Sequence, residues 1–422
     1  MLSKEIKYDV AVIGGGPAGM MAAGRAAERG LRVVLLEKNE SLGKKLLITG
    51  GGRCNLTNAE LDKRKFLAKF KDSDKFLFST FAQIGVAETL DFFHKQGLET
   101  KEEEGGRVFP LSNNAQSVFD VLMKYLKSGQ VEIITKAEVT GFNRDQSGQI
   151  ESVNLKDRSP IQAKSFVLAT GGKSHPETGS TGEGFDWLRQ LGHKVISPSA
   201  ALVPIRVSDT WVKTLSGISL PEAKLTLFLD KIRKSVKKGK ILFTHFELSG
   251  PAILNMSREV AELLQYGQVV ISLDLLPEHD FSTLNTALQE LLAKQDRKKI
   301  KNALDELTPS AFVSIILDHS NINPDTPCNS VTREERLALM KTLKDLPIHP
   351  TGLLGADKAI VTSGGIALEE VDFRTMGSRI VPNLYLVGDV LNIDRPSGGY
   401  SLQLCWTTGW VAGDSVRKPS NP

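Results

Sequence analysis

The chain has 422 residues, of which 41% are hydrophobic and 24% charged, so its composition is that of a globular protein and excludes a disordered or fibrous one. This length predicts two or three domains. The net charge of +4 comes from 53 basic and 49 acidic residues, a balance that does not by itself indicate a nucleic-acid or membrane partner.

Three cysteines, Cys54, Cys328 and Cys405, stand far apart and form no CxxC pair. We therefore expect reduced thiols and disfavour a disulfide reductase mechanism. No apolar run approaches the roughly 18 residues of a membrane-spanning helix, and no signal-peptide core follows the first residues. We expect a cytoplasmic protein with no membrane partner and no metal site. No feature of the sequence indicates an oligomeric state.

The first forty residues predict a strand, a turn, a helix and a second strand. Val10 to Ile13 is an apolar run typical of a parallel strand buried on both faces. Alanine-rich helical sequence then extends to Arg29, and Gly30 is placed to end that helix. Leu31 to Leu36 predicts the second buried strand. This order is that of a dinucleotide-binding βαβ unit.

The turn after the first strand has the GxGxxG pattern. Gly14 permits the tight turn, Gly16 lets the backbone approach a pyrophosphate, and Gly19 lets helix and strand pack closely. Pro17 and Ala18 begin the helix, whose free N–H groups and partial positive charge would face the phosphates.

Glu37 ends the second strand and is followed by Lys38. A carboxylate at this position would accept hydrogen bonds from an adenosine ribose, and it would repel a ribose phosphate, so the bound adenosine should not be that of NADP. The alternative is a glycine-rich turn without a ligand. The spacing of strand, helix, second strand and acid disfavours it.

Phe166 to Ala169 predicts another strand, and the turn after it resembles the ATGG turn of a flavoprotein superfamily, in which the chain crosses back near the cofactor. This resemblance assigns Ala169, Thr170 and Gly171 to the cofactor-binding site. Residues 131–162 predict a small β-meander, and Val139 falls where such proteins contact the adenine with their backbone.

Near the C-terminus, Leu384 to Val387 predicts a short buried strand, followed by a turn and by a helix from about Tyr400. The segment resembles the C-terminal element of flavoproteins with two dinucleotide-binding domains, in which an aspartate approaches FAD and a helix N-terminus points at the flavin. A helix N-terminus stabilises negative charge on reduced flavin. The alternative to a cofactor-binding element is an ordinary strand, turn and helix that close the domain. The residues assigned here are Gly388, Asp389, Gly399, Tyr400, Ser401 and Leu402.

The middle of the chain changes from strand-like to helical patterns. Alternation between residues 197 and 276 predicts strands, with turns at Ser216–Gly217 and Lys238–Gly239. Apolar residues spaced by three or four predict helices from 281 to 346, one of them beginning after Thr332. The segment Lys231 to Lys240 has six basic residues in ten. We interpret it as a solvated face, with a docking patch for an acidic protein, RNA or anionic substrate as the alternative.

The sequence contains, in order, the motifs GGGPAG, TGGGRCNLTN (49–58), GRVFP (106–110), ATGGKSHPETGSTGEG (169–184), LFTHFELSGPAIL (242–254), VTSGGIALEEVDFRTMGS (361–378) and GGYSLQ (398–403). Together these motifs resemble the HI0933-like, or BaiN-like, family of FAD-dependent oxidoreductases over nearly the full length. The chain departs from the family pattern at His175, where tyrosine is common, and at Gly388–Asp389 and Leu391–Asn392. Asp389 can replace the usual glutamate, but the substrate becomes harder to infer.

The resemblance implies an α/β fold in which an FAD-binding, Rossmann-like domain of the two-dinucleotide-binding-domain type is built from both ends of the chain. The expected divisions are 1–194 with 350–422 for this domain, 195–278 with 346–349 for an inserted β-barrel-like domain, and 279–345 for a helical insert. The family resemblance also implies that the stretch ITGGGRCNLTN, Ile48 to Asn58, runs along the cofactor.

In that stretch we expect glycines where a side chain would strike the cofactor or where φ is positive, namely Gly50, Gly51 and Gly52. Arg53 and Asn55 become candidate polar contacts to FAD. Cys54 is interpreted as a small residue in a tight space, with a redox-active thiol beside the flavin as the alternative.

The mechanistic hypothesis is hydride transfer from NAD(P)H to flavin N5, and then to the β-carbon of an activated alkene in a small-molecule substrate. His175 and His245 are candidate donors of a proton to the α-carbon, with structural hydrogen bonding as the favoured alternative for both. No second GxGxxG occurs, so NAD(P)H would have to approach the flavin without a Rossmann domain of its own. Two other functions stay open: an FAD-dependent RNA-modifying or RNA-binding protein, and a flavin-based redox-sensing regulator.

Overall fold

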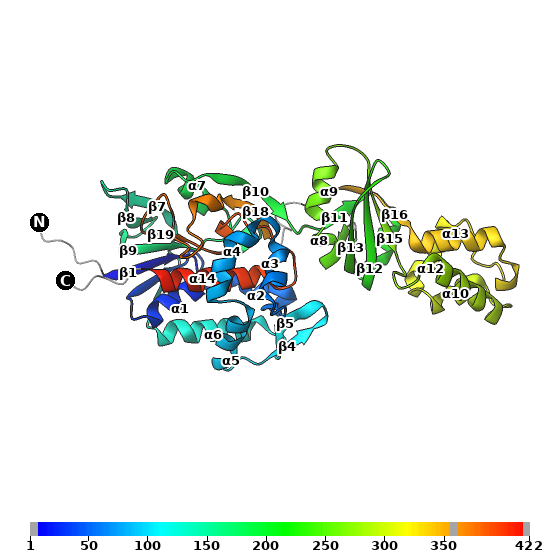
Figure 1. Cartoon of the computed structure of the whole chain (residues 1–422), viewed down its shortest axis with the longest axis horizontal. Helices are drawn as coiled ribbons and strands as arrows, with labels where there is room; N and C mark the ends of the chain where they lie inside the picture. Colours follow the sequence, from blue (N-terminus) through cyan, green and yellow to red (C-terminus); the bar gives the residue numbers. More distant parts are fainter. Residues whose placement is uncertain (1–6, 246, 355–360, 417–422) are drawn as a thin grey trace, which may run out of the picture. The chain divides into compact units, whose positions relative to one another are not determined.

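The computed structural model describes residues 7–245, 247–354 and 361–416. The chain divides into two compact units, one made of Met1–Ala200 with Ala359–Pro422 and the other of Ala201–Lys358 (Figure 1). The helices predicted as a separate insert at 279–345 share one hydrophobic core with the strands of the second unit. They therefore belong to the same compact unit as those strands.

A parallel sheet forms the centre of the first unit, in the order β6, β2, β1, β9, with β19 beside the C-terminal half of β9. Every residue of β1 is buried, as expected for a parallel strand covered on both faces. The register from Tyr8↔Ala163 to Ile13↔Leu168 ends β1 and β9 at the same edge. The strands are β1 (Tyr8–Ile13), β2 (Val33–Leu36), β6 (Glu132–Ile134), β9 (Ile161–Leu168) and β19 (Leu384–Leu386).

The predicted β-meander is shorter than expected. Strands β7 (Val139–Arg144) and β8 (Ile150–Leu155) pair antiparallel with each other, and β8 pairs with the start of β9. The segment before them was wrongly included, because β6 joins the parallel sheet beside β2. Helix α6 (Ala115–Ser128) comes immediately before β6, and such a crossover returns the chain parallel to its earlier strand.

Helices α1 (Pro17–Glu28) and α14 (Tyr400–Ser415) lie side by side (Figure 1). Small residues face each other between them: a Cβ on Gly409 would lie 2.3 Å from the Ala18 carbonyl oxygen, and one on Gly413 would lie 2.4 Å from that of Ala22. This close packing fixes the end of the chain against its beginning. The bounds of α14 confirm the helix that was predicted to begin at about Tyr400.

The glycine-rich stretch is partly helical, which the sequence did not predict. Helix α2 (Lys44–Gly52) includes a kink at Thr49, Gly50 and Gly51, whose backbone angles are not helical. Gly50, Gly51 and Gly52 all have φ between 57° and 82°, as predicted, a region that favours glycine.

The remaining elements of the first unit are short. A small antiparallel sheet joins β3, β5 and β4, and β10 pairs with β18. Their bounds are β3 (Thr57–Asn58), β4 (Thr100–Glu103), β5 (Arg107–Pro110), β10 (Val195–Ala201), β18 (Val361–Ile366), α3 (Lys63–Leu67), α4 (Asp74–Gln83), α5 (Val86–Lys95) and α7 (Glu183–Gln190).

The second unit is built on an antiparallel sheet of seven strands in the order β16, β15, β12, β13, β14, β11, β17. The predicted turn at Lys238–Gly239 is wrong: β13 passes straight through it, and the β12–β13 hairpin turns at Asp230–Lys231 instead. Both turn residues have positive φ, as the tight turn of a hairpin requires. The strands are β11 (Ile205–Val207), β12 (Ser219–Leu229), β13 (Ile232–Phe243), β14 (Glu247–Ser249), β15 (Val269–Asp274), β16 (Leu346–Ile348) and β17 (Pro350–Leu353).

The helices between residues 281 and 344 follow the predicted apolar spacing, whereas two short helices within residues 251–263 lie in the region that was wrongly predicted as strands only. The predicted start at Thr332 is confirmed: its hydroxyl accepts a hydrogen bond from Glu335 N at 3.1 Å, and the Glu335 carboxylate accepts one from Thr332 N at 2.8 Å. The helices are α8 (Pro251–Leu254), α9 (Ser257–Leu263), α10 (Phe281–Lys294), α11 (Ile300–Ala303), α12 (Ser310–His319) and α13 (Arg333–Lys344).

A buried histidine ties three segments of the first unit together. His193 Nδ1 lies 2.9 Å from a Glu370 carboxylate oxygen, and its Nε2 lies 3.0 Å from Ser378 Oγ. Burial lowers the pKa of His193 below its ordinary value of about 6.5, although hydrogen bonding to Glu370 opposes the shift.

This shift predicts a loss of stability in mild acid. The unfolded chain binds a proton at His193 as the pH falls through about 6.5, whereas the folded chain does so only at lower pH. The free energy of unfolding should therefore fall on acidification from pH 7.5 to 5.5, by up to about 1.4 kcal/mol per pH unit. Urea denaturation of the protein and of His193→Gln should show a shallower slope for the variant; equal slopes would exclude this titration.

Candidate functional site

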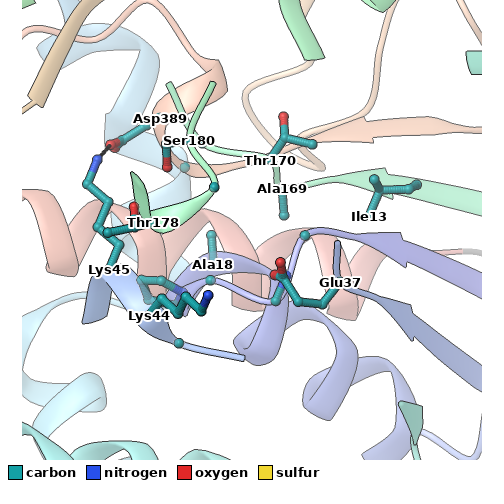
Figure 2. A pocket seen from close by; sticks show the side chains of 18 of the residues that line it. Ile13, Ala18, Glu37, Lys44, Lys45, Ala169, Thr170, Thr178, Ser180 and Asp389 are labelled. Carbon is teal, nitrogen blue, oxygen red and sulfur yellow. Dashed lines mark hydrogen bonds and ion pairs between the residues drawn. The ribbon is translucent and has the colours of Figure 1, made fainter. Parts of the chain in front are cut away.

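A cavity lies at the carboxyl edge of the parallel sheet, where open α/β sheets bind their ligands. Ile13 ends β1 and Ala169 follows β9 (Figure 2). Val387, which also lines the cavity, follows β19. Most of the predicted cofactor-binding residues line it: Gly14, Gly16, Pro17, Ala18, Glu37, Lys38, Val139, Ala169, Thr170, Gly171, Gly388, Asp389, Ser401 and Leu402. Both ends of the chain thus contribute to one cavity.

The three glycines of the first turn have different surroundings. A Cβ on Gly14 would lie 2.5 Å from the Ala169 carbonyl oxygen, and one on Gly19 would lie 1.9 Å from that of Gly14. Gly19 therefore serves close packing and lies outside the cavity lining. A Cβ on Gly16 would meet no heavy atom within 4 Å, so at this position the bare backbone borders open space. A pyrophosphate needs such a clear approach.

The N-terminus of α1 borders the cavity. This helix of 12 residues begins at Pro17, has no side-chain cap, and has no acidic residue in its first turn. Its N–H groups and partial positive charge are therefore available to an anion. Because Gly16 and Ala18 line the cavity, that anion would lie in it.

Glu37 is held rigidly at the end of β2. Its carboxylate is 8% exposed and accepts hydrogen bonds of 2.8 Å from Gly15 N, Asn39 N and Asn39 Nδ2. These three donors fix the carboxylate and leave one of its four lone-pair sites, on Oε2, for a ribose hydroxyl. The arrangement fits the ribose-binding role predicted from the sequence.

Replacing Glu37 with alanine should weaken FAD binding. Loss of charge-assisted hydrogen bonds costs about 1.5–3 kcal/mol, equivalent to about a 10- to 100-fold higher dissociation constant. Fluorescence titration of the apoprotein with FAD measures this dissociation constant. Glu40→Ala is the matched control, because Glu40 is exposed and pairs with Lys136 at the surface. Unchanged FAD affinity in Glu37→Ala would remove this residue from the site.

The other end of the cavity contains charged residues that the sequence did not single out. Lys45 of α2 donates a hydrogen bond to the buried Ser174 hydroxyl at 2.6 Å and lies 3.7 Å from an Asp389 carboxylate oxygen (Figure 2). Arg395, 6% exposed, forms an ion pair with the same carboxylate. It also donates to the Ile393 carbonyl at 2.6 Å and to Ser401 Oγ at 3.0 Å. Asp389 is therefore fixed between two cations.

Two further side chains bear on what the cavity can hold. The buried Thr170 hydroxyl has no hydrogen-bond partner among the described residues, which is a costly state unless a ligand pairs with it. Cys405 also lines the cavity, and burial raises its pKa to about 12, so it is a neutral thiol. A clear backbone, an uncapped helix, a buried carboxylate and an unpaired hydroxyl together fit a dinucleotide such as FAD.

The middle of the stretch from Ile48 to Asn58 does not line this cavity. Arg53 pairs with Glu103, donates to Asn113 Oδ1 at 3.1 Å and lies 4.0 Å from the Phe109 ring centroid. Burial raises the pKa of Cys54 to about 12, so a thiolate is disfavoured there. Thr49 does line the cavity, whereas the predicted residues Gly51, Gly52, Arg53, Cys54 and Asn55 lie outside its lining.

Asn55, Gly399 and Tyr400 have local structural partners. With its amide oriented to satisfy its neighbours, Asn55 accepts from Gly399 N at 3.0 Å and donates to the Val108 and Thr57 carbonyls. A Cβ on Gly399 would lie 2.3 Å from the Thr57 backbone. Tyr400 packs in an aromatic cluster, 4.7 Å from Phe66 between ring centroids. Their contact with the cofactor stays a prediction.

The two candidate proton donors lie in different units. His175, in the first unit, has a left-handed backbone and places Nδ1 2.8 Å from a Glu177 carboxylate oxygen; it is absent from the cavity lining. His245 is exposed in the second unit, after β13. A catalytic role for either residue stays a prediction.

Several lining residues were missed. They are Gly15, Asn39, Gly43, Lys44, Lys45, Leu46, Thr49, Ala137, Thr178, Gly179, Ser180, Glu183, Trp187 and Cys405. Gly43, which has φ of 69° and immediately precedes α2, is followed by Lys44 and Lys45. This GKK sequence was the feature from which the place of the two lysines at the cavity could have been predicted. Residues 178–183 belong to the motif at 169–184, but it was not carried as far as the cavity; loop packing brings them there, since Lys38 donates to Thr181 Oγ1 at 2.7 Å and pairs with Glu183 at 2.8 Å.

Within the described ranges, no helix has the length and apolar character needed to cross a bilayer. The same residues contain no cluster of three histidine, cysteine or acidic side chains placed to hold a metal ion.

Known proteins resemble this chain along nearly its whole length. It is 30% identical to the ribosomal RNA dihydrouridine synthase of Escherichia coli over 97% of this chain and 98% of that protein. It is 31% identical to the 3-dehydro-bile acid delta(4,6)-reductase of Clostridium scindens over 96% and 98%.

Among solved structures, a 3-ketosteroid-delta4-(5alpha)-dehydrogenase from Rhodococcus jostii matches 99% of this chain and 98% of its own, with a TM-score of 0.56 and 13% identity. At this identity the likeness shows a shared fold alone. The model of the HI0933-like protein Rossmann domain matches residues 8–415. The chain therefore belongs to the HI0933-like family of FAD-dependent oxidoreductases.

Proposed function

We propose that this protein reduces a carbon–carbon double bond conjugated to a carbonyl group, using FAD bound in the cavity at the sheet edge. The observation that carries the proposal is that cavity, because its clear backbone at Gly16, its uncapped helix and its buried Glu37 match the parts of a dinucleotide. The names of the two full-length relatives support the reaction class. Uridine becomes dihydrouridine by saturation of a double bond conjugated to a ring carbonyl, and a 3-oxo steroid with delta(4,6) unsaturation contains the same grouping.

In this proposal each part of the cavity binds one part of the cofactor. Glu37 accepts a hydrogen bond from a ribose hydroxyl, the N-terminus of α1 binds the pyrophosphate, and the Thr170 hydroxyl gains a hydrogen-bond partner. Asp389, fixed by Lys45 and Arg395, accepts hydroxyl groups at the other end. Bound flavin supplies the hydride-transfer chemistry.

The electron donor in the proposal is NAD(P)H, and the reaction balances as follows. Overall, the β-carbon of the substrate would gain the hydride of NAD(P)H and the α-carbon a proton from a side chain or from water, with FAD, held by Glu37 and the N-terminus of α1, supplying the hydride-transfer chemistry. The products are NAD(P)+ and the saturated carbonyl compound.

The two half-reactions can be tested separately under anaerobic conditions. NADH or NADPH should bleach the flavin absorbance, and an enone or unsaturated acid should restore it. Saturated analogues of the same compounds are the matched control and should not reoxidise the flavin. If dithionite-reduced protein is reoxidised by no conjugated alkene, the proposed reaction is wrong. If alkenes reoxidise it but neither nucleotide reduces it, only the proposed donor is wrong.

A further inference from the structure

The positive charge of the chain is concentrated on one hairpin of the second unit. Strands β12 and β13 with their turn, residues 219–243, contain seven basic and two acidic residues. Their net charge of +5 exceeds the +4 of the whole chain, so the remainder is close to neutral. A single element therefore carries the excess positive charge.

One face of this hairpin presents a group of lysines. Lys224 lies directly opposite Lys238, so both project from the same face of the sheet. Lys240 projects from that face too, because side chains two residues apart along a strand point the same way. The opposite face is the core face, where Ala223, Leu225 and Ile241 are fully buried. Lys231, Arg233 and Lys234 add exposed positive charge near the turn.

These charges lack internal partners. Across the described ranges, none of the seven basic residues of the hairpin forms an ion pair. Other lysines of the same unit are paired: Lys294 with Glu306, and Lys299 and Lys301 with Asp325. The unpaired lysines repel one another along the strands, and a polyanion would relieve that repulsion.

An exposed aromatic side chain lies beside the hairpin turn. Tyr266 is 76% exposed. Its loop is joined to the turn by two hydrogen bonds of 3.0 Å, from Asp230 N to the Gln268 carbonyl and from Gln268 N to an Asp230 carboxylate oxygen. An acidic protein would need only the cations, whereas an unpaired nucleic-acid base also stacks on an exposed aromatic ring.

We propose that the lysine face of β12–β13 and Tyr266 bind single-stranded RNA, with the lysines contacting phosphates and the tyrosine stacking on a base. One consequence of this inference rests on the proposed function: the conjugated double bond that the protein reduces then belongs to a uracil base within an RNA chain. The binding face itself does not depend on that reaction.

RNA binding is tested with the full-length protein and a fluorescently labelled oligouridine, followed by anisotropy at several salt concentrations. The triple variant Lys224→Gln, Lys238→Gln and Lys240→Gln should bind at least tenfold more weakly, and the slope of log affinity against log salt should fall by about two. The control variant Lys294→Gln, Lys299→Gln and Lys301→Gln makes the same charge change in the same unit and should bind as the parent does.

Tyr266 separates RNA from other polyanions. Tyr266→Ala should weaken binding by about tenfold, and Tyr266→Phe should bind normally, because stacking needs only the ring. Polyglutamate competing as well as RNA at equal charge would overturn the RNA assignment in favour of an acidic protein. Equal RNA binding by the two triple variants, or no binding by the parent protein, would overturn the binding face.

The binding face and the proposed reaction can fail independently. RNA binding that depends on these lysines, in a protein that reduces no conjugated alkene, would retain the face and reject the reaction. Reduction of small enones by a protein that does not bind RNA would do the reverse. Enone reduction should be equal in the two triple variants.

Discussion

Gly16→Val should abolish FAD retention, raising the dissociation constant by about 100-fold or more, while leaving the folded apoprotein intact. A Cβ at this position meets no protein atom within 4 Å, and the backbone angles of φ −79° and ψ −178° are open to any residue. The new side chain would therefore occupy only space in which the cofactor lies. FAD titration measures the loss, and urea denaturation of the apoprotein checks that stability is unchanged.

Gly19→Val provides the contrasting control three residues along the same turn. Its Cβ would lie 1.9 Å from the Gly14 carbonyl oxygen, so helix α1 would have to move away from β1. This variant should lose stability as apoprotein, by more than the roughly 1–3 kcal/mol typical of overpacking. If Gly16→Val destabilised the apoprotein as much as Gly19→Val does, the open space at Gly16 would not be a cofactor site.

Arg395→Ala should destabilise the apoprotein by about 3–5 kcal/mol, the usual cost of removing one partner from a buried ion pair. The loss would leave the Asp389 carboxylate with only Lys45, at 3.7 Å, and would free the Ile393 carbonyl and the Ser401 hydroxyl. Urea denaturation gives the free energy of unfolding. Arg189→Ala, which breaks an exposed pair with Asp186, is the matched control and should cost no more than about 1 kcal/mol.

A double-mutant cycle shows whether the effect belongs to the pair. Removing Asp389 together with Arg395, as Asp389→Asn with Arg395→Met, should recover part of the stability because no buried charge is left unpaired. Strictly additive losses would mean that Arg395 acts mainly through its contacts with Ile393 and Ser401.

Local sequence signals predicted many of the residues that line the cavity near β1 and β2. The strand Tyr8–Ile13, the glycine turn and Glu37 follow one another within forty residues, so spacing along the chain nearly determines their positions in space. The C-terminal contribution was also recognisable, because Gly388–Asp389 follows a short buried strand.

The other end of the cavity could not be predicted in the same way. Lys45 meets Asp389 across more than three hundred residues of chain, and only tertiary packing brings α2 and the turn after β19 together. Arg395 carries no local motif that predicts burial. The three glycines after Thr49 were expected beside the cofactor, but within residues 48–58 only Thr49 lines the cavity. The turn at Lys238–Gly239 was misplaced because β13 absorbs that glycine through a register shift in its pairing with β12.

The cofactor content of the purified protein tests the central claim most directly. The protein should show the visible absorbance of oxidised flavin and should release FAD, not FMN, on denaturation, in about one equivalent per chain. Gly16→Val prepared in parallel should be colourless while folded. A colourless parent protein that cannot be reconstituted with FAD, or one that releases FMN, would contradict the account.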